Sequence, residues 1–277
     1  MFYKFVKFIN KLKTAYRRIK NPAIRKNYLV IDVGSGDMPN PRADVICDSI
    51  EENTERITAL KTDRPFIWAD IENLPFRDKA FDYSIASHVI EHVDNPECAL
   101  RELERISRAG YIETPNAFYE FAIPHMYHLS RCTAINNKLI IFKKERWDET
   151  VDKKYFDIRY DMNKCWWNLH NLDAQALLTA YHWKNKIDYE IHGGKSFKKP
   201  KDLISESNAE RPPLQSLIIK LVYWFLKPRK KIDLKTLLVC PKCKGDLIFE
   251  DGTERANCQN CNLKFRKHKG FLDFRLL

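Results

Sequence analysis

Short apolar runs alternate with helical patterns along the chain from Tyr28 onward. Five runs rich in aliphatic and aromatic residues are bounded by Gly, Pro or charged residues, which is typical of buried parallel strands. The distances between them leave room for crossover connections. The expected strands are Leu29–Val33, Asp44–Cys47, Pro65–Trp68, Phe81–Ala86 and Gly110–Thr114. The pattern therefore predicts an α/β fold built on a Rossmann-like doubly wound sheet.

One helix is clearly encoded between the fourth and fifth of these strands. Asp94 or Asn95 is the expected N-cap, and Pro96 occupies the first turn, where its missing N–H leaves no hydrogen bond unmade. Apolar residues then follow at helical spacing on one stripe: Ala99, Leu100, Leu103 and Ile106. The helix is expected to end near Gly110 and to bury this stripe against the sheet.

The pattern after Pro115 is less regular. The aromatic segment AFYEFAIPHMYHL precedes an expected strand at Lys138–Lys143, a helix around Asp173–Trp183, and a strand near Lys186–His192 that would close the sheet. A later segment, GGKSFKKPKDLISESNAERPP, has the composition of a linker. The expected organisation is a basic helix at 1–27, a main domain at 28–194, a linker with an apolar helix at 195–233 and a small domain at 234–277.

The chain is basic, with a formal net charge of +11, and much of this charge lies at its start. Residues 1–30 hold nine Lys or Arg and no acidic residue. Hydrophobic residues stand between them at helical spacing: Phe2, Phe5, Val6, Ile9, Leu12, Tyr16 and Ile19. This pattern predicts a basic amphipathic helix that either docks on an anionic membrane or nucleic acid, or packs on its own domain.

A second apolar run, from Leu214 to Leu226, is too short to span a bilayer. It is expected to pack between domains or to lie in a membrane interface. The leader lacks the uninterrupted apolar core and the cleavage site of a secretory signal. The eight cysteines do not form a disulfide framework. These features predict a cytoplasmic protein, with peripheral contact to the inner membrane surface through the leader as an option.

The first expected strand leads directly into Gly34-Ser35-Gly36, where glycines allow a sharp turn and leave room for a ligand at the carboxyl edge of the sheet. Acidic residues end the next two strands. Asp48 closes ADVICD, where a carboxylate can accept hydrogen bonds from ribose hydroxyls, and Asp70 closes FIWAD. The arrangement indicates a cofactor site at this edge.

Four stretches of this region resemble, in the same order, the class I S-adenosylmethionine-dependent methyltransferases. They are Asp32-Val-Gly-Ser-Gly, the segment ADIENLPFRDKAFDY from Ala69, the segment SHVIEHVDNP from Ser87, and RELERI from Arg101. The resemblance covers roughly residues 29–116. It implies that Gly34 and Gly36 approach the methionine part of S-adenosylmethionine.

The same resemblance implies roles for residues of the neighbouring strands. Asp48 would bind the ribose, and Asp70 with Ile71 would bind the adenine. Asp32 would orient the glycine loop. Ser87 and His88 would line the cleft beside the sulfonium: they follow the fourth strand.

The chain departs from the family pattern after the glycines. The segment DMPNPRA replaces the usual third glycine and first helix, and only Gly34–Ala43 connects the first two strands. This length is near the minimum for a parallel crossover, so the first helix is expected to be a turn or absent. The shortened G-S-G-x-x-P form resembles a subgroup associated with sugar and cell-surface glycan modification.

The stretch SHVIEH also fits the inverted zinc-peptidase signature His-x-x-Glu-His, in which His88 and His92 would share a metal. Only about one helical turn is available before the cap of the next helix, whereas such a peptidase needs a longer helix and a third ligand. The methyltransferases show the same letters after their fourth strand. The hydrolase interpretation is therefore not favoured.

Two C-x-x-C pairs near the C-terminus are separated by 14 residues: Cys240 with Cys243, and Cys258 with Cys261. Four thiolates at this spacing can surround one structural Zn²⁺ tetrahedrally, and a redox role is the alternative. The zinc would supply folding energy that so small a module lacks. The segment resembles the zinc-ribbon activator subunit of several tRNA and protein methyltransferases, here fused to its enzyme.

The resemblance implies methyl transfer to a hydroxyl or amine of a small molecule or glycan intermediate. A hydroxyl acceptor requires a general base, and a neutral imidazole suits this task near pH 7. The candidates are His88, His92, His125 and His128. The first alternative is an RNA or protein methyltransferase that binds its substrate with the zinc ribbon and basic leader. The second is a non-catalytic binding module with the same fold.

Overall fold

The computed structural model describes residues 16, 20, 23–50, 58–122, 125, 128–144, 174–194, 217, 221, 224–226, 230–250 and 255–276. Most of the expected leader and linker therefore lies outside the described residues. In these two segments Tyr16, Lys20, Leu217, Leu221 and 224–226 are helical. No helix in the described part of the chain is long and apolar enough to cross a membrane.

The five expected strands form the centre of the main sheet in the order β3-β2-β1-β4-β5. Their bounds are Val30–Val33 for β1, Val45–Asp48 for β2, Phe66–Trp68 for β3, Phe81–Ser87 for β4 and Ser107–Pro115 for β5. All four pairings are parallel. The strand order reverses beside β1, as in a doubly wound fold, which confirms the expected fold class.

The connection between β1 and β2 contains turns and no helix, as expected from its length. A short 3-10 helix, η1 (Ile71–Asn73), follows β3, and a second, η2 (Ile90–His92), follows β4. The expected helix is α2 (Pro96–Ile106), and Oδ1 of Asn95 caps it by accepting the N–H of Cys98 at 3.2 Å. α2 ends before Gly110 because β5 already begins at Ser107.

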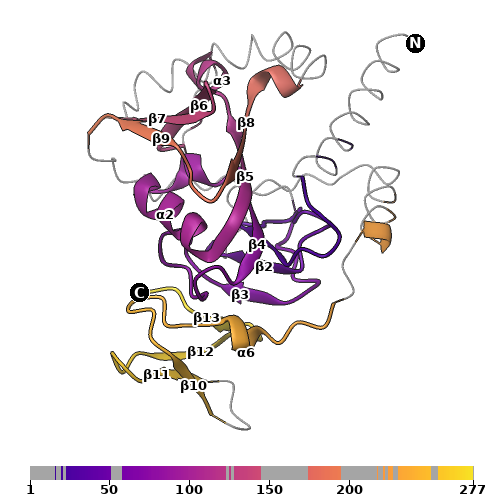
Figure 1. The fold of residues 1–277 in the computed structure, drawn as a ribbon, viewed down its shortest axis with the longest axis vertical. Coiled ribbons are helices and arrows are strands. Elements are labelled where there is room, and N and C mark those ends of the chain that lie inside the picture. Colours follow the sequence, from indigo (N-terminus) through magenta and orange to yellow (C-terminus); the bar gives the residue numbers. More distant parts are fainter. Residues whose placement is uncertain are drawn as a thin grey trace.

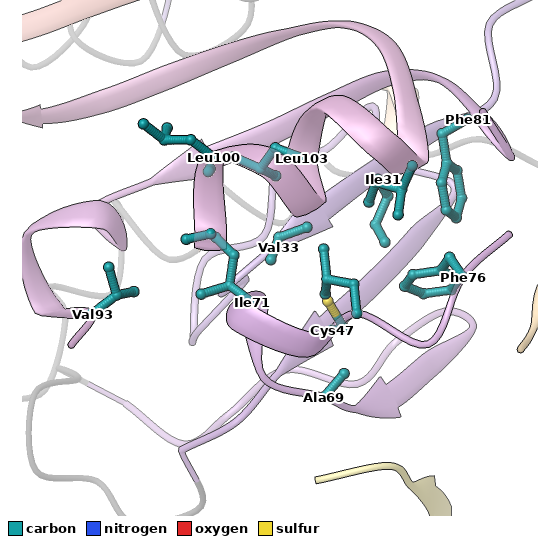
Figure 2. Packing of buried hydrophobic residues seen from close by; sticks show 14 of the residues in the cluster. Ile31, Val33, Cys47, Ala69, Ile71, Phe76, Phe81, Val93, Leu100 and Leu103 are labelled. Carbon is teal, nitrogen blue, oxygen red and sulfur yellow. The ribbon is translucent and has the colours of Figure 1, made fainter. Parts of the chain in front are cut away.

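Figure 2 shows the packing of α2 on the sheet. Leu100 and Leu103 belong to the same buried cluster as Val33 and Ile31 of β1, and both leucines are fully buried. Phe76 and Phe81 close the far end of this core with ring centroids 4.9 Å apart in an edge-on arrangement. The apolar stripe of α2 therefore covers one face of the sheet beneath the strands that carry the cofactor motifs.

The last strand of the main sheet differs from expectation. The helix predicted around Asp173–Trp183 is wrong: a short 3-10 helix, η3 (Ala174–Leu177), leads into β8 (Leu178–Lys184), which pairs antiparallel with β5. Burial alternates along β8, and its inward residues are β-branched or aromatic, which favours a strand. These residues are Thr179, Tyr181 and Trp183.

A small second sheet lies beside the main one in the order β6-β7-β9. Its strands are β6 (Ser130–Ile135), β7 (Lys138–Lys143) and β9 (Tyr189–His192). β7 confirms the expected strand, but the strand expected near Lys186–His192 does not close the main sheet, because β9 pairs with β7 and β8 occupies the edge. Figure 1 shows this sheet and α3 (Ala117–Ala122) above the main sheet.

The C-terminal segment forms a ribbon of four strands: β10 (Leu247–Phe249), β11 (Ala256–Cys258), β12 (Lys264–His268) and β13 (Phe271–Asp273). Successive strands pair antiparallel, and β13 then pairs parallel with β3. Figure 1 shows the ribbon, in orange and yellow, along the β3 edge, with the short helix α6 (Leu234–Leu237) before it. The ribbon therefore extends the main sheet rather than standing apart from it.

Candidate functional site

The glycine loop follows β1 at the carboxyl edge of the sheet. Gly34 and Gly36 have φ values of +69° and +55°, which glycine adopts without strain. The N–H groups of Gly34 and Ser35 both donate to the carbonyl of Cys47, at 2.9 and 3.1 Å. The Ser35 hydroxyl is buried and has no hydrogen-bond partner among the described residues. A polar ligand in this loop could satisfy that hydroxyl, so the loop fits a cofactor.

Gly34 is also required by a close approach within the protein. A Cβ added there would lie 2.3 Å from Cγ2 of Val89, in the loop after β4. The two loops are neighbours because β1 and β4 are adjacent parallel strands. The glycine loop and the SHVIEH segment thus meet at one edge of the sheet.

The carboxylates of Asp32 and Asp48 accept backbone hydrogen bonds from the connection between β1 and β2. Asp32 is buried and accepts the N–H of Asn40, which ties the end of the β1–β2 connection to β1. Asp48 accepts the N–H of Gly36 at 2.8 Å and that of Ile50 at 2.9 Å. Both contacts hold the loop in shape. Both carboxylate oxygens of Asp48 take part in these contacts, and its ribose contact stays a prediction.

Asp70 and Ile71 follow β3 on the same edge. Oδ1 of Asp70 accepts the N–H of Glu72 at 2.9 Å and so caps η1, while Ile71 is buried. Only one carboxylate oxygen of Asp70 is used in this contact, and the residue is half-buried. The structure thus places the expected adenine residues at the carboxyl end of β3, next to the loop after β2.

Ser87 and His88 end β4 in a strained turn. His88 has φ +58°, a conformation that costs a non-glycine residue about 1–3 kcal/mol. Its backbone N–H donates to the carbonyl of Glu113 at 2.7 Å, and the Ser87 hydroxyl donates to Oε1 of Glu113 at 3.4 Å. Glu113, on β5, was not singled out from the sequence, and it fixes the expected cleft residues against the neighbouring strand.

Three of the four histidines expected as base candidates lie around Glu91, and the fourth, His125, packs against one of them. Nδ1 of His88 lies 3.4 Å from Oε1 of Glu91. The ring of His92 stands perpendicular to that of His128, with centroids 4.6 Å apart, and the ring of His125 lies 4.7 Å from that of His128. The described part of the AFYEFAIPHMYHL segment therefore brings His125 and His128 to the η2 turn.

Glu91 is the electrostatic centre of this cluster. Burial alone would raise its pKa, but His88, His92 and His128 together lower the pKa to about 2. Its side chain is 2% exposed, and neither carboxylate oxygen accepts a hydrogen bond from any residue that the structure describes. A charged carboxylate in such surroundings favours positive groups beside it.

A second buried carboxylate holds His128. Oε2 of Glu120, on α3, lies 2.6 Å from Nδ1 of His128, and its other oxygen bonds to Nζ of Lys144 and to the backbone N–H of His125. Burial would raise the pKa of Glu120, but His128 and Lys144 lower it. Glu120 and Lys144 belong to no recognisable motif, so the sequence did not reveal them.

The four cysteines of the ribbon converge as expected. One sulfur from each lies within 4.8 Å of the others, with Cys240 and Cys261 at 3.6 Å and Cys243 and Cys258 at 3.3 Å. Zinc–sulfur bonds of about 2.3 Å in a tetrahedron separate the sulfurs by about 3.8 Å, so the site fits zinc. The two C-x-x-C loops are closed in the same way. The N–H of Cys240 donates to the carbonyl of Gly245, and the N–H of Cys258 donates to the carbonyl of Leu263, both at 2.9 Å.

A separate cavity of about 360 Å³ lies away from these groups. It is lined by Asn137, Tyr181, His182, Trp183, Lys184, Lys186 and Asp188. Lys184 pairs with Ala109 near the start of β5, so the cavity lies toward the amino edge of the sheet, opposite the glycine loop. It is not part of the site described above.

Comparison with known proteins identifies the region that builds the carboxyl edge. Residues 32–112 match the family model of a methyltransferase domain. This range runs from the end of β1 into β5 and includes the glycine loop, Asp70 and the η2 turn. No curated protein matches the chain.

Several solved structures are similar to the chain. The YcgJ protein of Bacillus subtilis is 20% identical, with a TM-score of 0.32, over 38% of this chain and 52% of that one. An S-adenosylmethionine-dependent methyltransferase of Thermotoga maritima is 20% identical, with a TM-score of 0.29, over 42% and 62%. A chain from the complex of the Haloferax volcanii Trm112 methyltransferase activator with a methyltransferase is 18% identical, with a TM-score of 0.34, over 47% and 65%. The chain thus spans about half to two thirds of these structures.

Proposed function

We propose that this chain, which carries a methyltransferase domain over residues 32–112, is an S-adenosylmethionine-dependent methyltransferase. It transfers a methyl group to a hydroxyl or an amine of a small molecule or glycan intermediate. The observation that carries the proposal is the meeting of two groups at one edge of the sheet: the glycine loop with its unsatisfied Ser35 hydroxyl, and the histidine cluster around Glu91.

The glycine loop and the residues after β3 would hold the cofactor. Gly34 and Gly36 turn the backbone at the carboxyl edge, and the Ser35 hydroxyl is available to the methionine part. Asp70 has an oxygen beyond the one used in capping, and Ile71 offers an apolar surface to the adenine. S-adenosylmethionine, when bound, supplies a methyl group on a sulfonium, which is a good leaving group.

The histidine cluster would prepare the acceptor. Methyl transfer is an in-line displacement, so the protein chiefly aligns the acceptor and excludes water. A neutral imidazole of the cluster takes the proton of the acceptor, and the negative Glu91 stabilises the imidazolium that forms. The strained backbone of His88 directly follows β4, and the next residue, Val89, contacts the glycine loop at Gly34.

Two features favour a small acceptor over a macromolecule. The cluster is recessed, since Glu91 and His128 are only 1% and 7% exposed. The ribbon is engaged by its own chain, because Nζ of Lys244, next to a knuckle cysteine, bonds to Glu102 of α2 at 2.8 Å. That knuckle thus contacts α2 of its own chain. The four cysteines would hold a structural zinc ion with no open position.

Calorimetric titration of the zinc-replete protein with S-adenosylmethionine tests the assignment. We expect saturable one-to-one binding that Asp70→Asn weakens about tenfold, since a charged hydrogen bond contributes about 1.5–3 kcal/mol. Asp82→Asn is the matched control, because Asp82 lies at the amino end of β4 and its contact with the N–H of Leu29 survives the change. A wild-type protein that does not bind the cofactor would be a non-catalytic module.

The acceptor class is tested with the same protein and a labelled methyl donor. Label should enter hydroxylated small molecules or glycan intermediates. If the label is recovered in RNA or protein, the chain is a methyltransferase, but its acceptor is a macromolecule and the proposed acceptor class is wrong.

A further inference from the structure

A second set of metal-binding side chains lies in the cleft, apart from the ribbon. One ligand atom each from Glu91, His92 and His128 lies within 4.8 Å of the others. We propose that these three residues bind a divalent transition-metal ion, for which Zn²⁺ suits the donor set well. Two imidazoles and one carboxylate hold zinc in catalytic sites and also suit other metals of the first transition row.

Glu91 lacks the partners that a buried carboxylate normally has. It is 1% exposed, and both of its oxygens are without a hydrogen bond among the residues described. Its ion-pair contacts are long, since Nδ1 of His88 lies 3.4 Å and Nε2 of His92 lies 4.0 Å from Oε1, and each pair is charged only when the imidazole is protonated. A buried charge of this kind is stable only when it is paired or coordinates a metal. A cation bound between Glu91 and the histidines would satisfy it.

His128 is oriented as metal-binding histidines are. Its Nδ1 lies 2.6 Å from a carboxylate oxygen of Glu120, and since a carboxylate can only accept, Nδ1 carries the proton. In the neutral ring, Nε2 therefore holds a lone pair. A carboxylate on the far nitrogen is the usual outer partner of a ligating histidine, because it fixes the tautomer and raises the basicity of the ring. Lys144 in turn holds Glu120.

The backbone ties the two ligand segments together. The N–H of Leu129, next to His128, donates to the carbonyl of Glu91 at 2.6 Å. His92 lies on η2 with Glu91, and its ring is already packed edge-on against that of His128. Ligand bonds of about 2.1 Å in a tetrahedron place donors about 3.4 Å apart, so small side-chain rotations would complete the site.

A catalytic role for this metal ion rests on the proposed function as a methyltransferase. Three protein ligands leave a coordination position open, and a hydroxyl bound there becomes more acidic. Its proton would pass to His88, which is 46% exposed beside Glu91. The acceptor oxygen then bonds to the methyl carbon as the carbon–sulfur bond breaks, and the sulfonium becomes a neutral sulfide. His92 and His128 would be ligands, so His88 and His125 remain as candidates for the base.

Metal counting tests the site without reference to activity. The full-length protein is equilibrated with Zn²⁺, freed of unbound ion, and its zinc is measured by mass spectrometry. The wild type should hold one ion per chain beyond the ribbon ion, and Glu91→Gln and His128→Ala should each lose it. His192→Gln is the matched control, because His192 is an exposed histidine on β9. An equal zinc content in the wild type and both variants would overturn the proposal.

Cobalt spectroscopy of the wild type keeps the test decisive if a variant fails to fold. Co²⁺ bound by thiolates gives intense sulfur-to-metal charge-transfer bands, whereas nitrogen and oxygen ligands give only weak d–d bands. A second equivalent of Co²⁺ should add d–d absorption without further charge-transfer absorption. Thiolate bands alone at saturation would overturn the metal proposal even if S-adenosylmethionine binds. Conversely, metal binding without cofactor binding would overturn only the proposed function.

Discussion

Individual residues at the carboxyl edge are fixed by neighbours from other strands. Gly34 is held at φ +69° against Val89, and His88 is held at φ +58° by the carbonyl of Glu113. Both follow a buried strand, where the surrounding sheet can impose a conformation that costs free energy. These positions are therefore sensitive to small changes.

The substitution Gly34→Ala should destabilise the protein by about 2–5 kcal/mol. The left-handed conformation costs an L-residue about 1–2 kcal/mol, and forcing a methyl group against Cγ2 of Val89 adds about 1–3 kcal/mol. Urea denaturation measures the loss.

Gly194→Ala is the matched control for this change, since a Cβ there meets nothing within 4 Å. Its effect should stay within about 0.5 kcal/mol. The double variant with Val89→Ala should recover part of the loss, because the clash is removed while the strain remains. A Gly34→Ala protein as stable as the Gly194→Ala protein would contradict the close approach.

At the scale of elements, α2 connects the cofactor edge to the ribbon. Glu102 on α2 accepts the N–H of Leu74 at 2.7 Å, pairs with Arg105 and receives Nζ of Lys244. The helix is thus fixed at its cap by Asn95 and in its middle by the contacts of Glu102 with Leu74 and Lys244. A substitution that destabilises α2 should therefore lower the stability of the protein.

Removal of the α2 cap should cost about 1 kcal/mol. Asn95→Ala deletes the acceptor of the Cys98 N–H, whereas Asn95→Asp retains an acceptor at the same place and should be nearly neutral. Thermal or urea unfolding of the two variants side by side measures the difference. Equal stabilities would show that the cap contributes nothing.

The hairpins illustrate which elements the sequence encodes locally. Asn136 and Asn137 both have positive φ and join β6 to β7, and Lys269 and Gly270 do the same between β12 and β13. Asparagine and glycine favour such type I′ turns, so Asn-Asn before the expected strand at Lys138–Lys143 was a usable signal for β6. The helix predicted over β8 failed for another reason, because pairing with β5 overrides weak local preference.

At the scale of the whole molecule, the ribbon and strands β1 to β5 share one sheet. Besides the β13–β3 pairing, the N–H of Phe274 donates to the carbonyl of Trp68 at 2.9 Å, and that of Val239 donates to the carbonyl of Pro75 at 2.9 Å. These contacts flank Asp70, the expected adenine residue. The folding of the ribbon should therefore support the cofactor edge.

The zinc ion proposed for the four cysteines should stabilise the entire chain. Cys243→Ser removes one ligand of a structural site and should cost more than about 3 kcal/mol, which corresponds to a fall in Tm of about 6–12 °C. Cys98→Ser is the matched control, since Cys98 lies on α2 outside the cluster and should change Tm little. Scanning calorimetry gives the Tm of both variants, and metal analysis gives their zinc content. An unchanged Tm for Cys243→Ser would show that the metal site does not stabilise the rest of the chain.

The sequence by itself determined the features that depend on neighbouring residues. These are the five parallel strands, the cap of α2, the glycine turn without a helix, and the two C-x-x-C knuckles. Their physics is local, since apolar runs, capping side chains and turn glycines act within a few residues.

Only the tertiary structure decided which distant residues meet. Glu91 and His128 meet because the N–H of Leu129 bonds to the carbonyl of Glu91. Glu120 on α3 holds His128, and Lys144 holds Glu120. Likewise β13 finds β3 across about two hundred residues. Such contacts depend on loop closure and on the packing of the whole core, and no short stretch of sequence contains that information.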